Sequence, residues 1–393
     1  MDIYLQPNWQ AGVRDTLIYL TTVFTSDDGH EQRSAERINA RRTVELDALL
    51  TGKSLRDLKA ILHSRSDFIC YVPEPVQVLS KVAVYAPLGS TSIQFEDAIP
   101  ASQVGRRVCV QGWKRYFFAE VASVSGNTVT FADPIEAEAR VGENLRACMV
   151  GHLPTSVTLN HVTDDVAVFP ATFLQLPGEK NAGYGTAPFT TFSGREVLTE
   201  KPNWTQPPSI EVIGDYEVTD FQRGIIKTYS PIDFVTKITQ FTFMGRSTAK
   251  MNRLIDFFHR QMGRLNEFWC PSWTSDLKLA QSISNGSSSI VVEGCAASDH
   301  YADSTVETAI AIRLPGDVWR FRKIAGITTN GTTSTITLTS TINLDVELGS
   351  EIGIYWLNVC RFATDAVTIQ WITDEVAQTV FQITTLEALP AES

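Results

Sequence analysis

The chain has 393 residues, of which 43% are hydrophobic and 20% charged, a composition that fits a folded globular protein and excludes a disordered one. Its formal charge of −11 argues against a nucleic-acid-binding surface, because phosphate contacts need clustered lysine and arginine. No stretch approaches the ~18 apolar residues of a membrane span, and the N-terminus lacks the basic and apolar pattern of a signal peptide.

Several short sequence segments occur twice along the chain, in the same order. Six segments of the first half return in the second half while their spacing drifts, as loop insertions and deletions after a duplication would produce. We therefore expect two tandem copies of one domain of about 200 residues. The matched segments are Pro7-Asn8-Trp9 with Pro202-Asn203-Trp204, Gln32-Arg33 with Gln222-Arg223, Phe68-Ile69-Cys70 with Phe268-Trp269-Cys270, and residues 89–93, 113–116 and 163–167 with 286–290, 319–322 and 373–377.

Each copy is expected to begin with a strand that ends at glycine and leads into a helix. Alternating apolar and polar residues predict strands over 42–46 and 238–243. Ser54 and Ser247 are suitable N-caps, and Asp57 adds a capping-box pattern, so a helix is expected to start at both serines. Apolar residues follow on one helix face in each copy, and the second helix is expected to be about one turn longer.

After each helix, a short extended segment stops at proline, at 68–73 and 268–271. Strand and turn patterns then continue for roughly 75 to 85 residues, which suits one small antiparallel β-barrel inserted into each copy. A hairpin then returns the chain to its parent domain, from 156–159 to 173–174 and from 366–369 to 381–383. The insert strands are expected over 92–95, 108–110, 116–121 and 128–131, and over 289–292, 311–314, 318–324 and 335–338.

The predicted fold is mainly β, with two tandem sandwich or barrel domains that each carry one flanking helix and one inserted barrel. Residues 178–200 are expected to form a linker, because glycine, proline and small polar residues gather at their start. The first domain is expected over 1–75 and 153–177 with its insert over 76–152, and the second over 201–275 and 361–393 with its insert over 276–360.

The motifs of common enzyme mechanisms are missing: there is no nucleophile elbow, zinc-protease helix, P-loop or dinucleotide-binding glycine motif. Only His63 and His259 match between the copies, and a structural role near a helix end is favoured over a catalytic one. We therefore expect no catalytic, cofactor-binding or metal-binding residues, and no enzyme. The six cysteines are expected to be buried thiols rather than disulfides or metal ligands: Cys70, Cys109, Cys148, Cys270, Cys295 and Cys360.

Two kinds of acidic cluster have alternative interpretations. The segment Asp27-Asp28-Gly29-His30-Glu31 can hold calcium, but it lacks the EF-hand spacing, so a solvated turn with Gly29 at positive φ is favoured. Asp164-Asp165 and Asp374-Glu375 are the paired carboxylates that match between copies. Glycoside hydrolysis needs two carboxylates that face each other across a sugar, whereas neighbours in a hairpin turn point apart, so a turn is favoured there too.

Aromatic residues of the inserts also allow two interpretations. They can stack on sugars, or they can fill a barrel core or an interface, and the second is favoured. Arg41-Arg42 and Lys114-Arg115 are too short to form a nucleic-acid patch. The aromatic residues are Trp113, Tyr116, Phe117, Phe118, Trp319, Phe321 and Trp356.

In the first copy, residues 28–33 (Asp-Gly-His-Glu-Gln-Arg) lead into the strand at 40–46 and then into the helix at 54–62. In the second copy, Phe221-Gln222-Arg223 precedes the strand that ends at Phe243, the helix, and Phe268-Trp269-Cys270-Pro271. This order resembles the distal tail proteins of long-tailed phages and gene transfer agents, in which a similar Gly-x-Glu-Gln-Arg segment precedes a strand and a capped helix. The resemblance covers most of each copy.

The resemblance implies a tail-tube-like domain of two packed sheets and a helix, in a ring that continues the tail tube to the tail tip and forms a channel for DNA ejection. Because such rings have six-fold geometry, a chain with two domains closes as a trimer with pseudo-six-fold symmetry; a hexamer is the alternative. The implied partners are the tail tube protein and other tip, hub and fibre proteins, with DNA as a transient passenger. An acidic chain suits such a channel.

The implied location is the virion, after assembly in the host cytoplasm. The alternative function is a module of the tail tip that binds host-surface carbohydrate through the inserts, and a tail-associated hydrolase is the third hypothesis.

Overall fold

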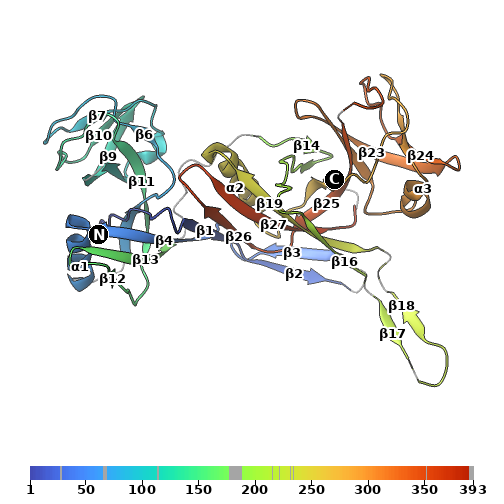
Figure 1. Ribbon diagram of the computed structural model, residues 1–393, viewed down its shortest axis with the longest axis horizontal. Helices are drawn as coiled ribbons and strands as arrows, with labels where there is room; N and C mark the ends of the chain where they lie inside the picture. Colours follow the sequence, from blue (N-terminus) through green and yellow to red (C-terminus); the bar gives the residue numbers. More distant parts are fainter. Residues whose placement is uncertain are drawn as a thin grey trace.

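A computed structural model describes the chain as an elongated molecule made mainly of antiparallel strands (Figure 1), so the expected mainly-β class is confirmed. Within the described part of the chain, no helix is both long and apolar enough to cross a bilayer. The described residues are 1–26, 29–64, 69–112, 115–176, 188–214, 216–220, 222–230, 232, 234–350 and 352–388.

The first half contains one α-helix among many strands, and the expected strands on both sides of that helix and in the following segment are confirmed. Its strand β1 and its β2–β3 hairpin were not expected. The elements are β1 (Val13–Ile18), β2 (Thr21–Thr25), β3 (Glu31–Ala35), β4 (Arg41–Thr51), α1 (Lys53–Ser64), β5 (Ile69–Pro73), β6 (Ser80–Lys81), β7 (Ser92–Gln94), the 3-10 turn η1 (Ala101–Gln103), β8 (Arg107–Gln111), β9 (Tyr116–Ser125), β10 (Thr128–Phe131), β11 (Asn144–His152), β12 (Asn160–His161) and β13 (Val166–Gln175).

The second half again places a helix after a long strand, and here too the expected strands are present. The short helix α3 was not expected. The elements are β14 (Thr191–Phe192), β15 (Arg195–Glu196), β16 (Ser209–Ile213), β17 (Glu217–Thr219), β18 (Lys227–Tyr229), β19 (Thr236–Gly245), α2 (Thr248–Gln261), β20 (Phe268–Pro271), β21 (Ser289–Glu293), α3 (Ala296–Tyr301), β22 (Ala309–Leu314), β23 (Val318–Thr329), β24 (Thr333–Leu338), β25 (Gly353–Phe362), β26 (Ala366–Trp371) and β27 (Ala377–Thr385).

The segment expected to be a linker, 178–200, is only partly described, since residues 177–187 lie outside the described residues. Its later part forms the β14–β15 hairpin. Val197 and Leu198 are fully buried, and the Leu198 backbone N–H donates to the Trp269 carbonyl at 2.8 Å. Residues 188–200 are therefore packed against the second half.

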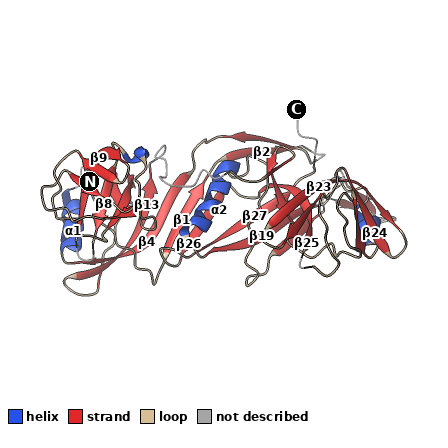
Figure 2. Cartoon of the chain, turned by 90° about the horizontal axis from the view of Figure 1, so that it is seen from above, coloured by secondary structure: helices blue, strands red, loops and turns tan. Residues whose placement is uncertain are grey.

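One antiparallel sheet runs through both halves in the strand order β12-β13-β4-β1-β26-β27-β19-β16. Figure 2 shows most of these strands following one another along the molecule, with α2 beside them. The two halves meet where β1 pairs with β26, in a register that joins Val13 to Trp371 and Ile18 to Ala366. The N-terminal strand thus extends the sheet of the C-terminal half.

The same hydrogen bonds recur around the two Pro-Asn-Trp segments. The Asn8 backbone N–H donates to the Asp47 carbonyl, and that of Asn203 to the Thr242 carbonyl, each at 2.7 Å. The Asn8 side-chain oxygen accepts from the Gln10 backbone N–H, and Asn203 accepts likewise from Thr205, each at 3.2 Å. Both segments therefore fasten the chain to the long strand before a helix.

The two helices start differently, and the expected N-cap at Ser54 is wrong. Ser247 caps α2, because its side chain accepts a hydrogen bond from the Lys250 backbone N–H. Ser54 instead lies inside α1 and bonds back to the Thr51 backbone, and the Asp57 carboxylate accepts from the Tyr116 hydroxyl at 2.9 Å. A left-handed glycine, Gly52 (φ 51°), makes the turn from β4 into α1.

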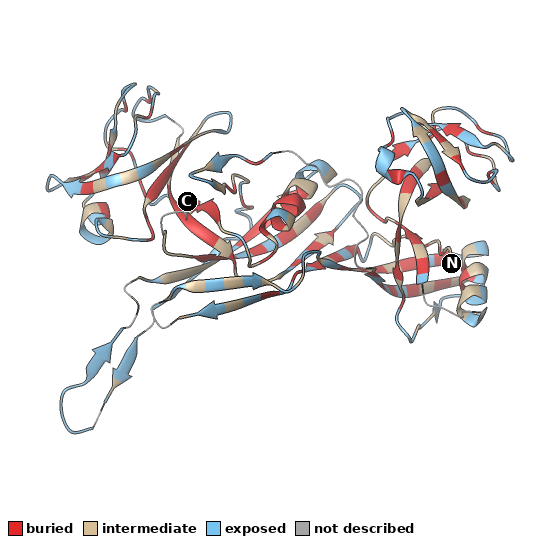
Figure 3. Cartoon of the chain, turned by 180° about the vertical axis from the view of Figure 1, so that it is seen from behind, coloured by how far each residue is buried: buried red, intermediate tan, exposed pale blue. Residues whose placement is uncertain are grey.

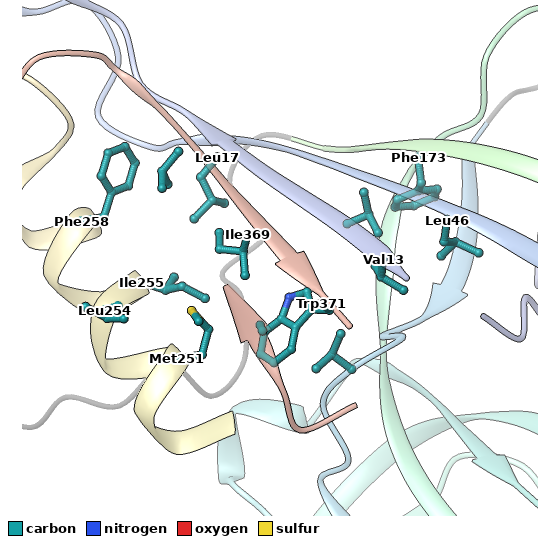
Figure 4. Close-up of a cluster of buried hydrophobic side chains, with 14 of the residues drawn as sticks. Val13, Leu17, Leu46, Phe173, Met251, Leu254, Ile255, Phe258, Ile369 and Trp371 are labelled. Atoms are coloured by element: carbon teal, nitrogen blue, oxygen red, sulfur yellow. The ribbon is translucent and has the colours of Figure 1, made fainter. Parts of the chain in front are cut away.

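The junction between the halves covers a shared hydrophobic core. Val13 and Leu17 of β1 are fully buried, as is Ile369 of β26, because alternate residues of each strand point to the same face. Figure 4 shows α2 pointing its apolar face toward these strands. The helix contributes Met251, Leu254, Ile255 and Phe258 to this cluster.

Two further hydrophobic clusters lie in the segments that follow each helix. One is built from residues between Val82 and Leu145, the other from residues between Leu277 and Trp356, which also includes Ala297 of α3. In the first, β7, β10, β9, β8 and β11 pair in that order; in the second, β21, β24, β23, β22 and β25 do so. Each segment therefore buries apolar residues of its own.

We predict that Ile369→Ala lowers the free energy of unfolding by roughly 2–4 kcal/mol, because it opens a cavity in the core that the two halves share. Urea unfolding at fixed protein concentration measures the change. Ile372→Ala is the matched control: its side chain is 42% exposed just beyond the same strand, so the expected change is about 0.5 kcal/mol or less. Equal losses in both variants would contradict a core at the junction.

Candidate assembly interface

The paired carboxylates lie at exposed hairpin turns, as the favoured interpretation requires. The Thr163 hydroxyl accepts from the Asp165 backbone N–H, and the Thr373 hydroxyl accepts likewise from Glu375. In the other acidic cluster, Gly29 has φ 86° in the turn between β2 and β3, while Asp27 and Asp28 lie outside the described residues. Among the residues that the structure describes, no group of three or more His, Cys, Asp or Glu side chains is placed to hold a metal ion.

The matched histidines differ in environment. The His259 ring lies 2.8 Å from the Tyr19 hydroxyl, and burial lowers the pKa of this histidine to about 4. His63 is exposed near the end of α1. His259 thus contacts the first half of the chain through Tyr19, whereas the matching His63 is exposed.

The cysteines are free thiols. Four of them are buried as expected, but Cys148 and Cys295 are only half-buried, so the expectation of burial is wrong for those two. Burial raises the pKa of the Cys70 thiol to about 11, which keeps it protonated at neutral pH.

The insert aromatics that the structure describes pack against other protein side chains. Phe117, Phe321 and Trp356 are buried in hydrophobic clusters. Tyr116 stacks on Tyr4 with ring centroids 4.0 Å apart. Phe118 contacts the Tyr116 ring, and Trp319 contacts the rings of Trp273, Phe321 and Tyr355. Trp113 and Lys114 lie outside the described residues.

A pocket of about 390 Å³ lies between α1 and the segment that follows it. Its wall includes Tyr116, the ion pair between Arg107 and Asp2, and Lys53, whose ammonium lies 5.1 Å from the centre of the Tyr116 ring. Each polar group named here already contacts another protein group. The residues around the pocket therefore serve mainly to hold the segment after α1 against the start of the chain.

The most developed polar contacts instead surround the junction between the halves. After β1, the Tyr19 backbone N–H donates to the Asp365 carbonyl at 2.9 Å, and the Thr21 N–H donates to the Asp365 carboxylate at 2.8 Å. The Arg264 guanidinium donates to the Thr21 carbonyl at 2.7 Å. These bonds hold the start of the β2–β3 hairpin against the second half.

Ion pairs fix the far strand of this hairpin. The Arg361 guanidinium donates two hydrogen bonds of 2.7 Å to the Glu31 carboxylate, and both side chains are nearly buried. Arg33 pairs with Glu267 and donates to the Leu265 carbonyl. Paired charges with this two-pronged geometry set the position of the hairpin as well as adding stability.

Beneath the junction lies a buried ionic triad. The Arg42 guanidinium of β4 donates to Asp15 of β1 at 2.6–3.0 Å and to Glu74 at 2.8 Å. Burial raises the pKa of the Asp15 carboxyl, while the nearby Arg42 opposes that rise. The triad links β1 to β4 of the first half. The other edge of β1 pairs with β26 of the second half.

At the β16 end of the sheet, by contrast, the strand edge has no partner among the described residues. All five residues of β16 are exposed, and Ile210 and Val212 are 48% and 63% exposed. The β17–β18 hairpin projects from the body (Figures 1 and 3), and it too is mostly exposed. Its exposed large hydrophobic residues are Tyr216, Val218, Ile225, Ile226 and Tyr229. Apolar residues on an open strand edge are typical of a surface that pairs with another chain.

The exposed residues of β16 were missed in the sequence, although one weak signal exists. Ile210 and Val212 flank Glu211 in an alternating pattern that is typical of a half-buried strand. In β1, Asp15 interrupts the corresponding alternation of apolar residues. This carboxylate is buried because it pairs with Arg42, which the sequence alone does not indicate.

No protein-family model and no curated protein matches this chain.

We predict that a double-mutant cycle of Glu31→Gln and Arg361→Gln gives a coupling of about 1–3 kcal/mol to the free energy of unfolding, because both charges are nearly buried and doubly hydrogen-bonded. The same cycle on Arg14 and Glu45, a pair that is 58% and 46% exposed, is the control. Its coupling is expected below about 1 kcal/mol. Similar couplings for the two pairs would contradict a fastening role for Glu31 and Arg361.

We also predict that His259 makes the fold less stable in acid. Its pKa is about 4 in the folded chain against 6.5 in the unfolded chain, so the unfolded state binds the proton more readily. The stabilisation is complete above pH 6.5 and is lost as pH falls toward 4, by roughly 1–3 kcal/mol. Thermal unfolding of His259→Gln should depend less on pH over this window, whereas the exposed-site control His63→Gln should keep the wild-type dependence.

Proposed function

We propose that the protein is a structural component of a phage tail tip, of the distal tail protein type, which forms a ring that continues the tail tube and joins it to hub and fibre proteins. The observation that carries this proposal is the single sheet shared by two halves whose strands follow the same order. A chain built of two side-by-side units supplies two neighbouring positions of a ring.

The equivalence of the two halves rests on more than short sequence matches. From the open end at β16, the order is β16, β19, β27 and β26; from the junction, it is β1, β4, β13 and β12. The hydrogen bonds of Asn8 and Asn203 recur with it. We therefore infer a duplication into two tail-tube-like domains, each with one long flanking helix and an inserted small β-barrel.

In this proposal the ring is a trimer with pseudo-six-fold symmetry, and a hexamer is the second arrangement. The chain acts by its geometry and carries out no catalysis. Its negative charge suits a channel through which DNA passes without adhering. Binding of host carbohydrate through the inserts gains no support from the described aromatics, because they pack against protein groups.

Electron microscopy of the purified full-length chain tests the proposal. We expect closed rings with six similar units around an open centre, and native mass spectrometry is expected to give three chains per ring. Six chains per ring would favour the hexamer. A chain that stays monomeric in both measurements, at micromolar concentration and at the concentration used for microscopy, would contradict the ring and with it the proposed function.

A further inference from the structure

We propose that β16 of one chain pairs with the β12 edge of a second copy, so that the contact between chains repeats the internal contact between β1 and β26. This inference rests on the proposed ring, and it names the strands and the register that close it. Among the described residues, β16 pairs only with β19 and β12 only with β13, so each has one edge open.

The strand β16 occupies in the second half the position that β1 occupies in the first. Arg14 pairs with Glu45 in β4, and Ser209 pairs with Gln240 in β19. Both partners are thus displaced by the same 195 residues. This displacement also carries Asn8 onto Asn203, whose hydrogen bonds match.

The open edge at β12 corresponds in the same way to β26. Asn160 pairs with Val168, and Gln370 pairs with Gln378, so both partners are displaced by 210 residues. β26, which has β1 beside it, is six residues long, whereas β12 is only two. Just before β12, apolar residues alternate with polar ones as in a half-buried strand. Val157 and Leu159 are half-buried and pack against the shared core, but this segment has no strand beside it to pair with among the described residues.

The two displacements fix the register between chains. Within the chain, Leu17 pairs with Val367. Applying the two displacements to this pair predicts that Val212 of one chain pairs with Val157 of the next. The pair of Asp15 with Ile369 becomes Ile210 with Leu159, and that of Thr16 with Thr368 becomes Glu211 with Thr158.

This register brings apolar residues together on the face that leads to the core. Leu17 and Ile369 are fully buried by the internal junction. Their counterparts Val212, which is 63% exposed, and Leu159 would be covered by the same contact between chains. Covering exposed apolar side chains next to an existing core is favourable, at about 25 cal/mol for each Å² removed from water.

The β17–β18 hairpin follows β16 as the β2–β3 hairpin follows β1. The β2–β3 hairpin reaches across the junction and is held by Arg361 of β25 and by the contact of Tyr19 with His259 of α2. In the first half of the neighbouring chain, the elements that correspond to β25 and α2 are β11 and α1, where His63 is exposed. The projecting hairpin therefore lies across β11 and α1 of the neighbouring chain, which covers its exposed apolar residues.

A second copy is the occupant because this chain contains both sides of the contact and already forms it once internally. One edge of the sheet binds a different edge, which is a head-to-tail contact; repeated by rotation, it closes into a ring. The same sheet then continues without interruption from chain to chain.

A disulfide test uses the full-length chain carrying both Glu211→Cys and Thr158→Cys. At the internal counterpart, the Thr16 and Thr368 hydroxyl oxygens are 3.2 Å apart, so cysteines here are close enough to bond. Within one chain the two positions lie at opposite ends of the sheet, roughly 30 Å apart, so only chains in contact can crosslink. We expect mild oxidation to give covalent trimers on a denaturing gel.

The matched control moves one cysteine along the same face by two residues, as Glu211→Cys with Asn160→Cys, and is expected to lose the crosslink. Each single-cysteine variant reports any crosslinking through the native thiols. Equal crosslinking in the control, or none in the test variant while the wild-type chain forms rings, would overturn the proposed register and leave the ring intact.

A second experiment asks whether the open edge drives assembly. The variant Ile210→Lys with Val212→Lys places charges on exposed residues and is expected to abolish the ring, giving a monomer with an unchanged circular dichroism spectrum. The control, Val318→Lys with Leu348→Lys, alters apolar residues that are 43% and 56% exposed and lie away from the edge, and it should keep the ring. Rings that persist in the edge variant would overturn this inference alone, whereas a monomeric wild-type chain would overturn the proposed function as well.

Discussion

The pairing of β1 with β26 is the contact on which the rest of the molecule depends. It joins residues as far apart in the sequence as Thr16 and Thr368, whose hydroxyls touch across the two strands. It turns two sheets into one, and it closes the core that α2 shares with both halves. The buried triad of Asp15, Arg42 and Glu74 makes the position of β1 more specific, since a shifted strand would leave a buried charge unpaired.

The same pairing also explains why the two hairpins differ. The β2–β3 hairpin is held by the Glu31–Arg361 and Arg33–Glu267 ion pairs, because the second half lies beside it. The β17–β18 hairpin, which starts from the outer strand of the sheet, has no such neighbour within the described chain and projects outward. One chain thus displays one occupied and one open version of a similar surface, and this likeness is the basis of the contact that we propose between chains.

Much of the fold could be predicted because its signals are local. The strands before the helices, and the strands β26 and β27 that return after the second insert, have the alternation of half-buried strands. The first return strand was expected over 156–159, which is wrong, because the structure has only the two-residue strand β12 at Asn160–His161. The β1 strand could not be predicted in this way, because its central inward position is Asp15 and its outer partner lies some 350 residues away. Ser54 has the identity of an N-cap, but the left-handed Gly52 turns the chain earlier and α1 begins at Lys53. The repeat predicted two equivalent units but could not indicate which edges meet, since edge pairing depends on the assembled sheet.

The distance in sequence between β1 and β26 also matters during synthesis. A ribosome that adds about 5–20 residues per second needs some tens of seconds to make the chain between these two strands. During that time Val13 and Leu17 have only their own half to pack against, and one edge of β1 stays unpaired. The polar residues Arg14, Asp15 and Thr16 between them make this waiting strand a poor template for wrong pairing. The junction consequently cannot form before β26 has been synthesised, and until then β1 keeps one unpaired edge.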